Sequence, residues 1–242
     1  MASASELLDL LGSPKDDSEG LLTKRILLLL ESRVLLGEAA HWSLIDRVID
    51  AYWINEHLHE NDYLPFMLVN DIVRYWRIVL LNHESRLRKR ERELCADSNI
   101  KPAERDARLL AERRHRSYRL RLPRCLTCFS ALTYLLALTP STPAHVSKAD
   151  VRAMIELTPL ERLRRLPQVA GRELPRVNAL LDVYRCYLQR TNVSKAELLH
   201  QLEHDPKVQV EVPREGRRFT ELTFELVQEL GGGRPLHRHM LV

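Results

Sequence analysis

The sequence predicts an all-α protein, a multi-helix bundle with at most one short extended or β segment near the C-terminus. Only 8 of its 242 residues are glycine, and long Leu-rich segments place apolar residues at the spacing of one helix face. A hydrophobic content of 45% is enough to bury one substantial core or two small ones. We therefore expect a single helical domain over residues 1–242, with a possible subdivision into 1–139 and 145–242.

The N-terminal part of the chain contains three expected helices. The first covers Ala4 to Leu11 and is closed by a Gly-Ser-Pro turn. The second is the stretch LLTKRILLLLESRVLL, which stops at Gly37 and is apolar nearly all round, as is typical of a central helix. The third is amphipathic and runs from Glu38 to about His57.

A long helix follows and leads into the most charged part of the chain. Asp62 is expected to cap this helix, and Pro65 is tolerated in its first turn. The helix should continue past Arg86 into the segment RLRKRERELCADSNIK and break near Asn99 and Pro102.

The next helix begins at Pro102 and reaches toward Tyr118. Pro123 should kink or end it before the apolar stretch CLTCFSALTYLLAL, because proline lacks the amide proton that a helix interior needs. Pro140 and Pro143 then mark a loop.

The C-terminal part carries clear helix-start signals and one break in the helical pattern. Val208, Val210 and Val212 alternate with polar residues in KVQVEVP, which predicts a short strand or an extended linker. A final helix is expected over about Thr220 to Leu230. Three helix starts have capping-box spacing, with an acidic residue three positions after Ser or Thr: Ser147 with Asp150, Thr158 with Glu161, and Ser194 with Glu197.

The positive charge of the chain is local. The net charge is only +4, from 37 Lys or Arg against 33 Asp or Glu. Between Arg86 and Arg124, however, fourteen basic residues stand against six acidic ones, a balance of +8, so the rest of the chain sums to −4. The basic character is therefore concentrated in this segment.

The sequence gives no sign of export or membrane insertion. The stretch MASASELLDLLGSPKDD lacks a cationic region followed by a long apolar run. CLTCFSALTYLLAL is too short and too rich in Thr and Ser to span a bilayer. Four cysteines in a chain of this size are expected to be reduced thiols. We therefore expect a cytoplasmic protein with no membrane partner.

Two patterns that could hold a metal lack the required ligands. Asp16 and Asp17 are adjacent and would diverge on a strand, whereas two-metal chemistry needs carboxylates on one face, so a loop leading into the next helix is favoured. Cys125 and Cys128 form half of a zinc pattern without a matching second pair, which favours core cysteines. No catalytic residue, metal or cofactor is expected.

The stretch NDIVRYWRIVLLNH contains the first candidate binding site. Asn70, Arg74 and Arg77 stack along one strip of the expected helix, where guanidinium groups could bind a phosphate or a carboxylate. The alternative is structural: Arg74 and Arg77 would pair with acids such as Glu31 and tie the long helix to the Leu-rich one.

The second candidate is the basic run RRHRSYRLRLPR. Arg116 and Arg119 flank Tyr118 there and could contact phosphates while the ring stacks on a base. The alternative is a solvated helical hairpin whose arginines pair with neighbouring glutamates.

A third pattern joins Arg77 to His83. Their spacing resembles that of HEPN-like all-helical ribonucleases, in which an arginine and a histidine act on an RNA phosphate. The resemblance implies metal-independent RNA cleavage by these two residues.

Taken in order, LLTKRILLLLESRVLL, YLPFMLVNDIVRYWRIVLL, PLERLRRL and LLDVYRCYL resemble the helical region that follows the catalytic domain in predicted bacterial nucleotidyltransferases of the DNA polymerase β-like superfamily. The ordered set covers most of the chain. The Gly-Ser turn and metal-binding carboxylates of that catalytic domain have no counterpart here, so no catalytic residue is carried over.

This resemblance implies a non-catalytic helical accessory module that stands alone or belongs to a longer nucleotidyltransferase. Such a module would bind a nucleotide, a nucleic acid or a partner protein, with Asn70, Arg74, Arg77, Arg116 and Arg119 facing the ligand. Two alternatives remain: the HEPN-like ribonuclease, and a regulatory protein that docks on a separate catalytic subunit.

Overall fold

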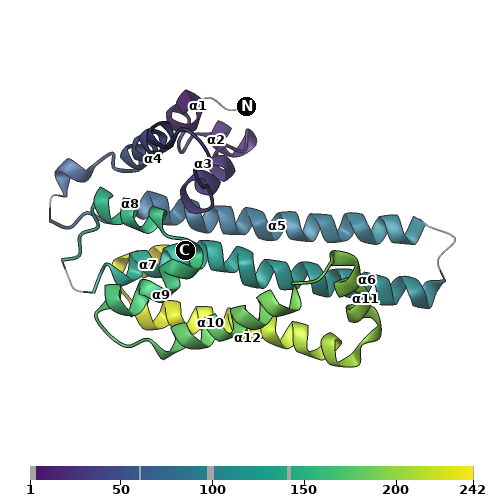
Figure 1. The fold of residues 1–242 in the computed structure, drawn as a ribbon. Helices are drawn as coiled ribbons and strands as arrows, with labels where there is room; N and C mark the ends of the chain where they lie inside the picture. Colours follow the sequence, from purple (N-terminus) through teal and green to yellow (C-terminus); the bar gives the residue numbers. More distant parts are fainter. Residues whose placement is uncertain (1–3, 60, 97–100, 141–142, 242) are drawn as a thin grey trace. The chain divides into compact units, whose positions relative to one another are not determined.

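The computed structural model describes residues 4–59, 61–96, 101–140 and 143–241, and these residues confirm the all-α prediction (Figure 1). Helices and turns account for their regular structure, and no strand occurs among them. The chain forms two compact units, each built from separate segments. Unit 1 comprises Met1–Tyr75, Thr127–Leu174 and Val227–Val242, and unit 2 comprises Trp76–Leu126 and Pro175–Leu226.

The helices divide between these units, and three of them contribute to both. Unit 1 contains α1 (Ala4–Asp9), α2 (Pro14–Ser18), α3 (Leu21–Leu30), α4 (Glu38–Tyr52), the turn η1 (Glu56–Leu58), α8 (Lys148–Glu156), α9 (Pro159–Ala170) and α13 (Pro235–Leu241). Unit 2 contains α6 (Pro102–Arg119), the π-helical segment η2 (Leu120–Arg124), α10 (Pro175–Arg190) and α11 (Lys195–His204). The shared helices are α5 (Phe66–Ala96), α7 (Cys125–Ala137) and α12 (Pro206–Gly231).

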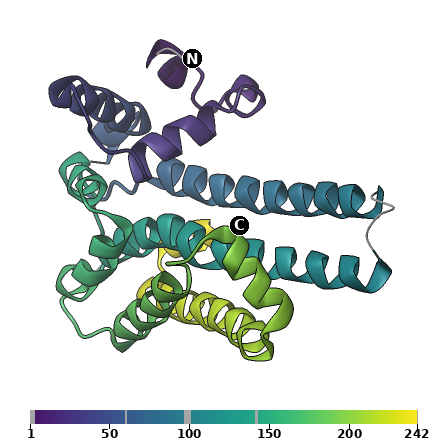
Figure 2. The same ribbon diagram turned by 45° about the vertical axis from the view of Figure 1, so that its right-hand side comes forward.

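The long helix predicted from NDIVRYWRIVLLNH exists as α5, which is one unbroken helix in both views (Figures 1 and 2). Asp62 does not cap it, contrary to the prediction. The Asp62 carboxylate instead lies 3.1 Å from the ring of His59, and the helix starts with the Val69 amide donating to the Pro65 carbonyl. The expected break near Asn99 falls outside the described residues.

The Leu-rich helix is shorter than predicted. α3 ends at Leu30 rather than Gly37, because the amides of Glu31 and Ser32 both donate to the Leu27 carbonyl and close the last turn. Leu35 and Leu36 lie beyond it and are 93% and 94% exposed.

The prediction of a strand or linker at KVQVEVP is wrong, because this stretch lies inside α12. Val208 and Val212 are buried, while Val210 is exposed. Residues four apart share a helix face, so the same alternating valines also fit a helix. The final helix therefore begins at Pro206 rather than near Thr220.

The predicted helix starts in the C-terminal part are confirmed. Complete capping boxes begin α8 at Ser147 and α9 at Thr158, with hydrogen bonds in both directions. The Ser194 hydroxyl accepts the Glu197 amide at 3.1 Å at the start of α11. Pro123 perturbs the chain as expected, since it lies in the π-helical segment between α6 and α7.

A buried arginine ties helix ends together in unit 1. Arg162 on α9 is 0% exposed and donates to the carbonyls of Met154 and Leu30 at 2.9 and 3.4 Å. These carbonyls lie at the C-terminal ends of α8 and α3, where oxygens lack partners within the helix. Burial lowers the pKa of Arg162 to about 10, and Arg33 adds to the effect.

Candidate functional site

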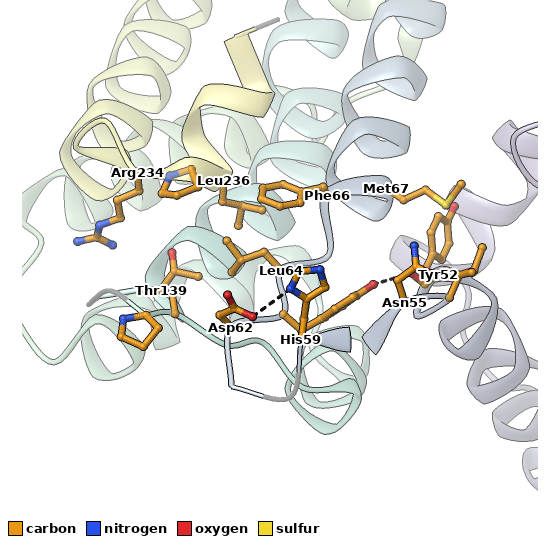
Figure 3. Close-up of a pocket in the computed structure, with 15 residues that line it drawn as sticks. Tyr52, Asn55, His59, Asp62, Leu64, Phe66, Met67, Thr139, Arg234 and Leu236 are labelled. Atoms are coloured by element: carbon orange, nitrogen blue, oxygen red, sulfur yellow. Dashed lines mark hydrogen bonds and ion pairs between the residues drawn. The ribbon is translucent and has the colours of Figure 1, made fainter. Parts of the chain in front are cut away.

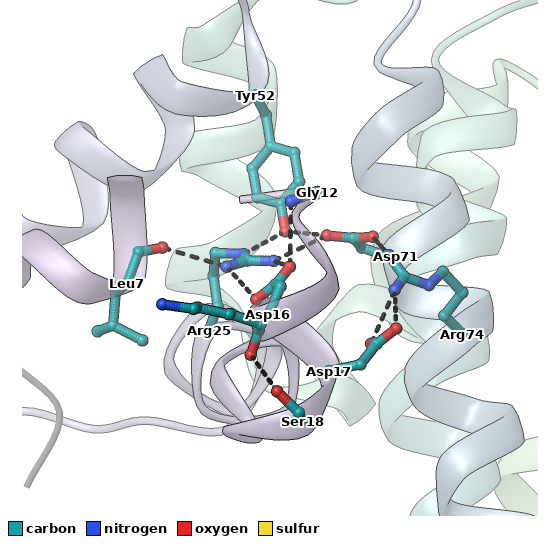
Figure 4. Close-up of polar contacts among 10 residues, drawn as sticks. Leu7, Gly12, Asp16, Asp17, Ser18, Arg25, Tyr52, Asp71 and Arg74 are labelled. Atoms are coloured by element: carbon teal, nitrogen blue, oxygen red, sulfur yellow. Dashed lines mark hydrogen bonds and ion pairs between the residues drawn. The ribbon is translucent and has the colours of Figure 1, made fainter. Parts of the chain in front are cut away.

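The most tightly bonded polar cluster lies in the core of unit 1 and centres on Arg25 of α3 (Figure 4). Its guanidinium binds the Asp16 carboxylate at 2.6 and 3.0 Å and the Asp71 carboxylate at 3.1 Å. It also donates to the Tyr52 hydroxyl at 2.8 Å and to the Leu7 carbonyl at 3.1 Å. The cluster therefore connects five helices, α1 to α5, through one side chain.

The electrostatics of this cluster favour a structural role. Burial by itself lowers the pKa of Arg25, but the hydrogen bond to Asp16 and the interactions with Tyr52 raise it overall, so the guanidinium stays charged. Burial and the Asp71 charge raise the pKa of Tyr52, which stays protonated. Every strong donor here has an internal acceptor, which leaves little for a ligand to bind.

Sequence reasoning missed this cluster. Asp16 and Asp17 lie in the short helix α2 rather than in a loop, and Asp16 is fully buried. The available signal was Arg25 itself. A charged residue in a helix that is apolar nearly all round needs a buried partner, and a carboxylate is the usual one.

Arg74, from the predicted strip on α5, is bound by two carboxylates. Its guanidinium lies 2.7 Å from both oxygens of Asp17 and 2.9 Å from Asp71. Burial lowers its pKa, but these two acids raise it overall. Arg74 is thus paired with acids, as the structural alternative expected. Its partners are Asp17 and Asp71, whereas the alternative named Glu31 as an example. The other residues of the strip, Asn70 and Arg77, are exposed on the same helix.

The two arginines predicted from the basic run also have internal interactions. Arg116 donates to the Glu112 carboxylate at 3.3 Å, and Arg90 of α5 donates to the same group at 3.1 Å. Burial raises the pKa of Glu112, but the two arginines lower it overall. Arg119 is exposed and its charge acts on Tyr187. Arg116 is thus paired with a neighbouring glutamate, as in the structural alternative, whereas Arg119 forms no ion pair among the described residues.

Other arginines of the run line two adjoining cavities in unit 2. The larger has a volume of about 510 Å³, and its lining includes His83, Glu84, Ser117, Arg121, Arg217 and Glu221. The smaller has a volume of about 220 Å³, and its lining includes Arg113, Arg114, Ser117, Tyr118, Arg121 and Arg217. Because the cavities share three lining residues, we treat them as one feature, the arginine groove, defined by Arg113, Arg114, Arg121 and Arg217.

The arginine groove has more positive charge than nearby acids neutralise. Arg113 pairs with Glu91 at 3.2 Å. Within the described ranges, the other three arginines of the groove form no ion pair with a carboxylate. They come from α6, η2 and α12, so three helical segments direct cations to one place. Glu84 and Glu221 line only the larger cavity.

A glycine on α12 shapes the groove. A Cβ atom at Gly216 would lie 3.3 Å from Cδ of Arg121 and 3.9 Å from the Tyr118 ring. The absence of a side chain therefore lets the stem of Arg121 lie against α12. The charged head of Arg121 remains exposed, as is usual for an arginine with a covered stem.

His83 lines the larger cavity, and its pKa reflects the positive charges around it. Burial lowers the pKa of His83, Glu84 acts in the opposite direction, and Arg116 and Arg121 lower it further. The imidazole is consequently mostly neutral at pH 7. It can then accept one hydrogen bond and donate another.

The groove was only partly predictable. The basic run pointed to the right helix, but the residues named from it, Arg116 and Arg119, do not line either cavity. Arg217 was missed because its stretch followed a segment predicted to be extended. The sequence signal for this part of the groove was the pair of arginines in EGRRF. It points to a basic helix surface only if that stretch is recognised as helical.

The metal and cysteine patterns considered in the sequence can be compared with the described residues. No group of three or more His, Cys, Asp or Glu side chains among them could hold a metal ion. Cys125 and Cys128 are buried as predicted, and burial raises the pKa of Cys125 to about 12. In the same part of the chain, no helix is both long and apolar enough to cross a membrane.

Comparison with known proteins adds no family to these observations. No protein-family model matches the chain, and searches of curated proteins and of solved structures give no match.

Proposed function

We propose that unit 2 binds the phosphate groups of a nucleic acid or nucleotide in the arginine groove. The observation that carries this proposal is the convergence of Arg114, Arg121 and Arg217, which have no carboxylate partner among the described residues. Arginine presents a planar fork of donors that matches two phosphate oxygens, and phosphate is a stronger ligand than water for such a group.

The other lining residues support a nucleotide rather than a bare anion. Ser117 lines both cavities and adds a hydroxyl group to the same lining as the arginines. Trp76 and Leu80 line the larger cavity and add apolar surface on which a base could pack. The resemblance to the helical region of nucleotidyltransferases implies an accessory module that binds a substrate without reacting with it. The proposed phosphate binding agrees with that expectation.

The test is fluorescence anisotropy with labelled RNA and DNA single strands of about 20 nucleotides and with a labelled ATP analogue. The double variant Arg121→Gln with Arg217→Gln should bind about tenfold or more weakly. The slope of log affinity against log salt should fall by about 1.4, since each phosphate contact on a single strand contributes about 0.7.

A matched control is available on the same helix. Arg105 and Arg108 lie on α6 outside both cavities, so the double variant Arg105→Gln with Arg108→Gln removes the same charge. It should keep most of the affinity. Equal losses in the two double variants would mean that the protein binds through its general charge, and absence of binding by the unaltered chain would refute the proposal.

RNA cleavage is a second candidate because His83 lies in the same cavity as Arg121 and Arg217. A mostly neutral imidazole beside two guanidinium groups could accept a proton while they hold a phosphate. The arginine of the ribonuclease pattern, Arg77, is not part of this lining. Cleavage of RNA in EDTA that is lost in His83→Ala but kept in Arg77→Ala would support this candidate over simple binding.

A further inference from the structure

We propose that a separate cavity in unit 1 binds a small organic anion with an apolar body. The cavity has a volume of about 590 Å³ and lies among the end of α4, the start of α5, the segment after α7 and the start of α13 (Figure 3). Sites for small molecules commonly have volumes of about 300–1,000 Å³. The cavity therefore has room for a ring system or a short acyl chain.

The lining of this cavity is mostly apolar. Three aromatic rings contribute to it, from Tyr52, Tyr63 and Phe66, and Met67 and Leu236 add aliphatic surface. Figure 3 shows Met67 and Tyr52 at one end and Arg234 at the other, with Phe66 and Leu236 between them. A ligand that fills this space must therefore be apolar over most of its surface.

Arg234 supplies the one strong charge without a carboxylate partner in this lining. One of its terminal nitrogens donates to the Leu136 carbonyl at 3.3 Å, and the described residues contain no ion pair with this guanidinium. Burial lowers the pKa of Arg234, and the nearby Arg172 lowers it further. A partly buried cation in this state favours an anionic ligand.

Apart from the neutral amide of Asn55, the other polar side chains of the lining are already engaged. Asp62 and His59 pair with each other at 3.1 Å. The Tyr63 hydroxyl donates to the Tyr52 carbonyl at 2.8 Å, and the Thr139 hydroxyl donates to the Leu136 carbonyl at 2.9 Å. Arg234 is therefore the charged group that would fix the orientation of a ligand, with a carboxylate or phosphate at its end of the cavity.

The experiment measures binding of three probes with the same aromatic body to the full chain: 2-naphthoate, 2-naphthamide and 2-naphthylmethylammonium. Fluorescence titration should show that the anion binds about tenfold more tightly than the neutral amide, because only the anion pairs with Arg234. Decanoate, added as a competitor, distinguishes an acyl chain from a ring as the preferred body.

Three variants locate the site. Arg234→Gln should remove the preference for naphthoate over the amide, and Arg234→Lys should retain part of it. Ala144→Phe, which fills the cavity, should weaken the binding of naphthoate and of the amide. Arg238→Gln is the matched control, because Arg238 lies on α13, donates to the Gly233 carbonyl at 3.0 Å and does not line the cavity.

The outcome is decisive in either direction. Circular dichroism melts confirm that each variant is folded, and nucleic-acid binding by Arg234→Gln should be unchanged, which separates this site from the arginine groove. If the amide or the cation binds as tightly as naphthoate, if Arg238→Gln has the same effect as Arg234→Gln, or if no probe binds, the proposal is wrong.

Discussion

The side chain of Arg25 shows how one residue can determine the stability of a whole core. Its guanidinium is fully buried and neutralises Asp16 and Asp71, which are 0% and 2% exposed. Desolvating three charged groups is costly, and only their mutual contacts offset that cost. The buried charges stabilise the core only while all three are present, and removing one of them destabilises the folded state.

Replacing Arg25 with methionine should therefore lower the free energy of unfolding by about 3–5 kcal/mol, because the buried Asp16 carboxylate loses its counter-charge and Asp71 keeps only Arg74. Urea denaturation followed by circular dichroism measures this loss. Arg185→Ala is the control, since Arg185 pairs with Asp182 on an exposed surface and should cost less than about 1 kcal/mol. Similar losses in both variants would contradict the burial of this cluster.

His115 on α6 should make stability depend on pH. Its side chain is buried, and its Nδ1 atom has no partner among the described residues. Burial lowers the pKa of His115; Arg119, Lys195 and Arg116 lower it too, and Glu112 opposes them. Because the folded-state pKa lies below the unfolded one, the unfolded chain takes up the proton first.

The stability contributed by a neutral His115 is fully present above the unfolded pKa of about 6.5 and is lost as the pH falls through that value toward the folded pKa. The melting temperature should thus be lower at about pH 5.5 than at about pH 7.5. His115→Gln should reduce this difference, although His83, whose pKa is also lowered, keeps part of it. A difference of the same size in the variant would assign the effect to other groups.

At the scale of elements, the helix starts are the best-determined features because their signals are local. The Thr158 hydroxyl accepts the Glu161 amide at 3.2 Å, and the Glu161 carboxylate accepts the Thr158 amide at 2.7 Å. Both bonds satisfy amide groups that have no partner within α9.

Thr158→Ala should destabilise the protein by about 1 kcal/mol, because it removes the side-chain half of this box. Thermal or urea unfolding gives the value. Thr158→Ser keeps the hydroxyl and should recover most of the loss. An alanine variant as stable as the unaltered chain would show that α9 is held by packing alone.

The same scale shows where local patterns fail. Capping boxes and proline positions were predictable because a few neighbouring residues determine them. KVQVEVP was not, because its valines at 208 and 212 satisfy both a two-residue and a four-residue period. The end of α3 at Leu30 was missed because apolar residues continue to Leu36, and only the contacts made by Arg162 and the closing turn stop the helix earlier.

At the scale of the whole molecule, the functional residues were harder to predict than the fold. The all-α class follows from the amino-acid composition and from the helical period of the apolar residues, which nearly every segment shows. The arginine groove joins α6 to α12, whose arginines are about a hundred positions apart along the chain, and the Arg25 cluster joins residues 9 and 46 positions apart. Contacts of this kind depend on tertiary packing that one sequence does not display.

The two compact units are interleaved along the chain, and this has a direct experimental consequence. A fragment of residues 1–139 lacks α8 and α9, which provide Val151, Met154, Leu163 and Leu166 to the core of unit 1. It also lacks the whole second segment of unit 2. Residues 145–242 alone lack the first segment of each unit, which ends at Tyr75 in unit 1 and at Leu126 in unit 2.

Neither fragment should unfold cooperatively by itself, because each unit needs segments from both sides of the cut. Urea titration followed by circular dichroism tests this in both fragments, with the full chain as the control; tryptophan fluorescence adds a second probe for residues 1–139 and the full chain, because all three tryptophans precede residue 139. A cooperative transition in either isolated fragment would mean that the boundary near residues 139–145 separates independent domains.

The route of the chain also constrains how such a protein can change over generations. Each unit is encoded by separate stretches of the gene, so no single crossover or insertion can transplant one intact into another protein. Point substitutions and altered loops, in contrast, can change either unit while the whole chain is inherited together.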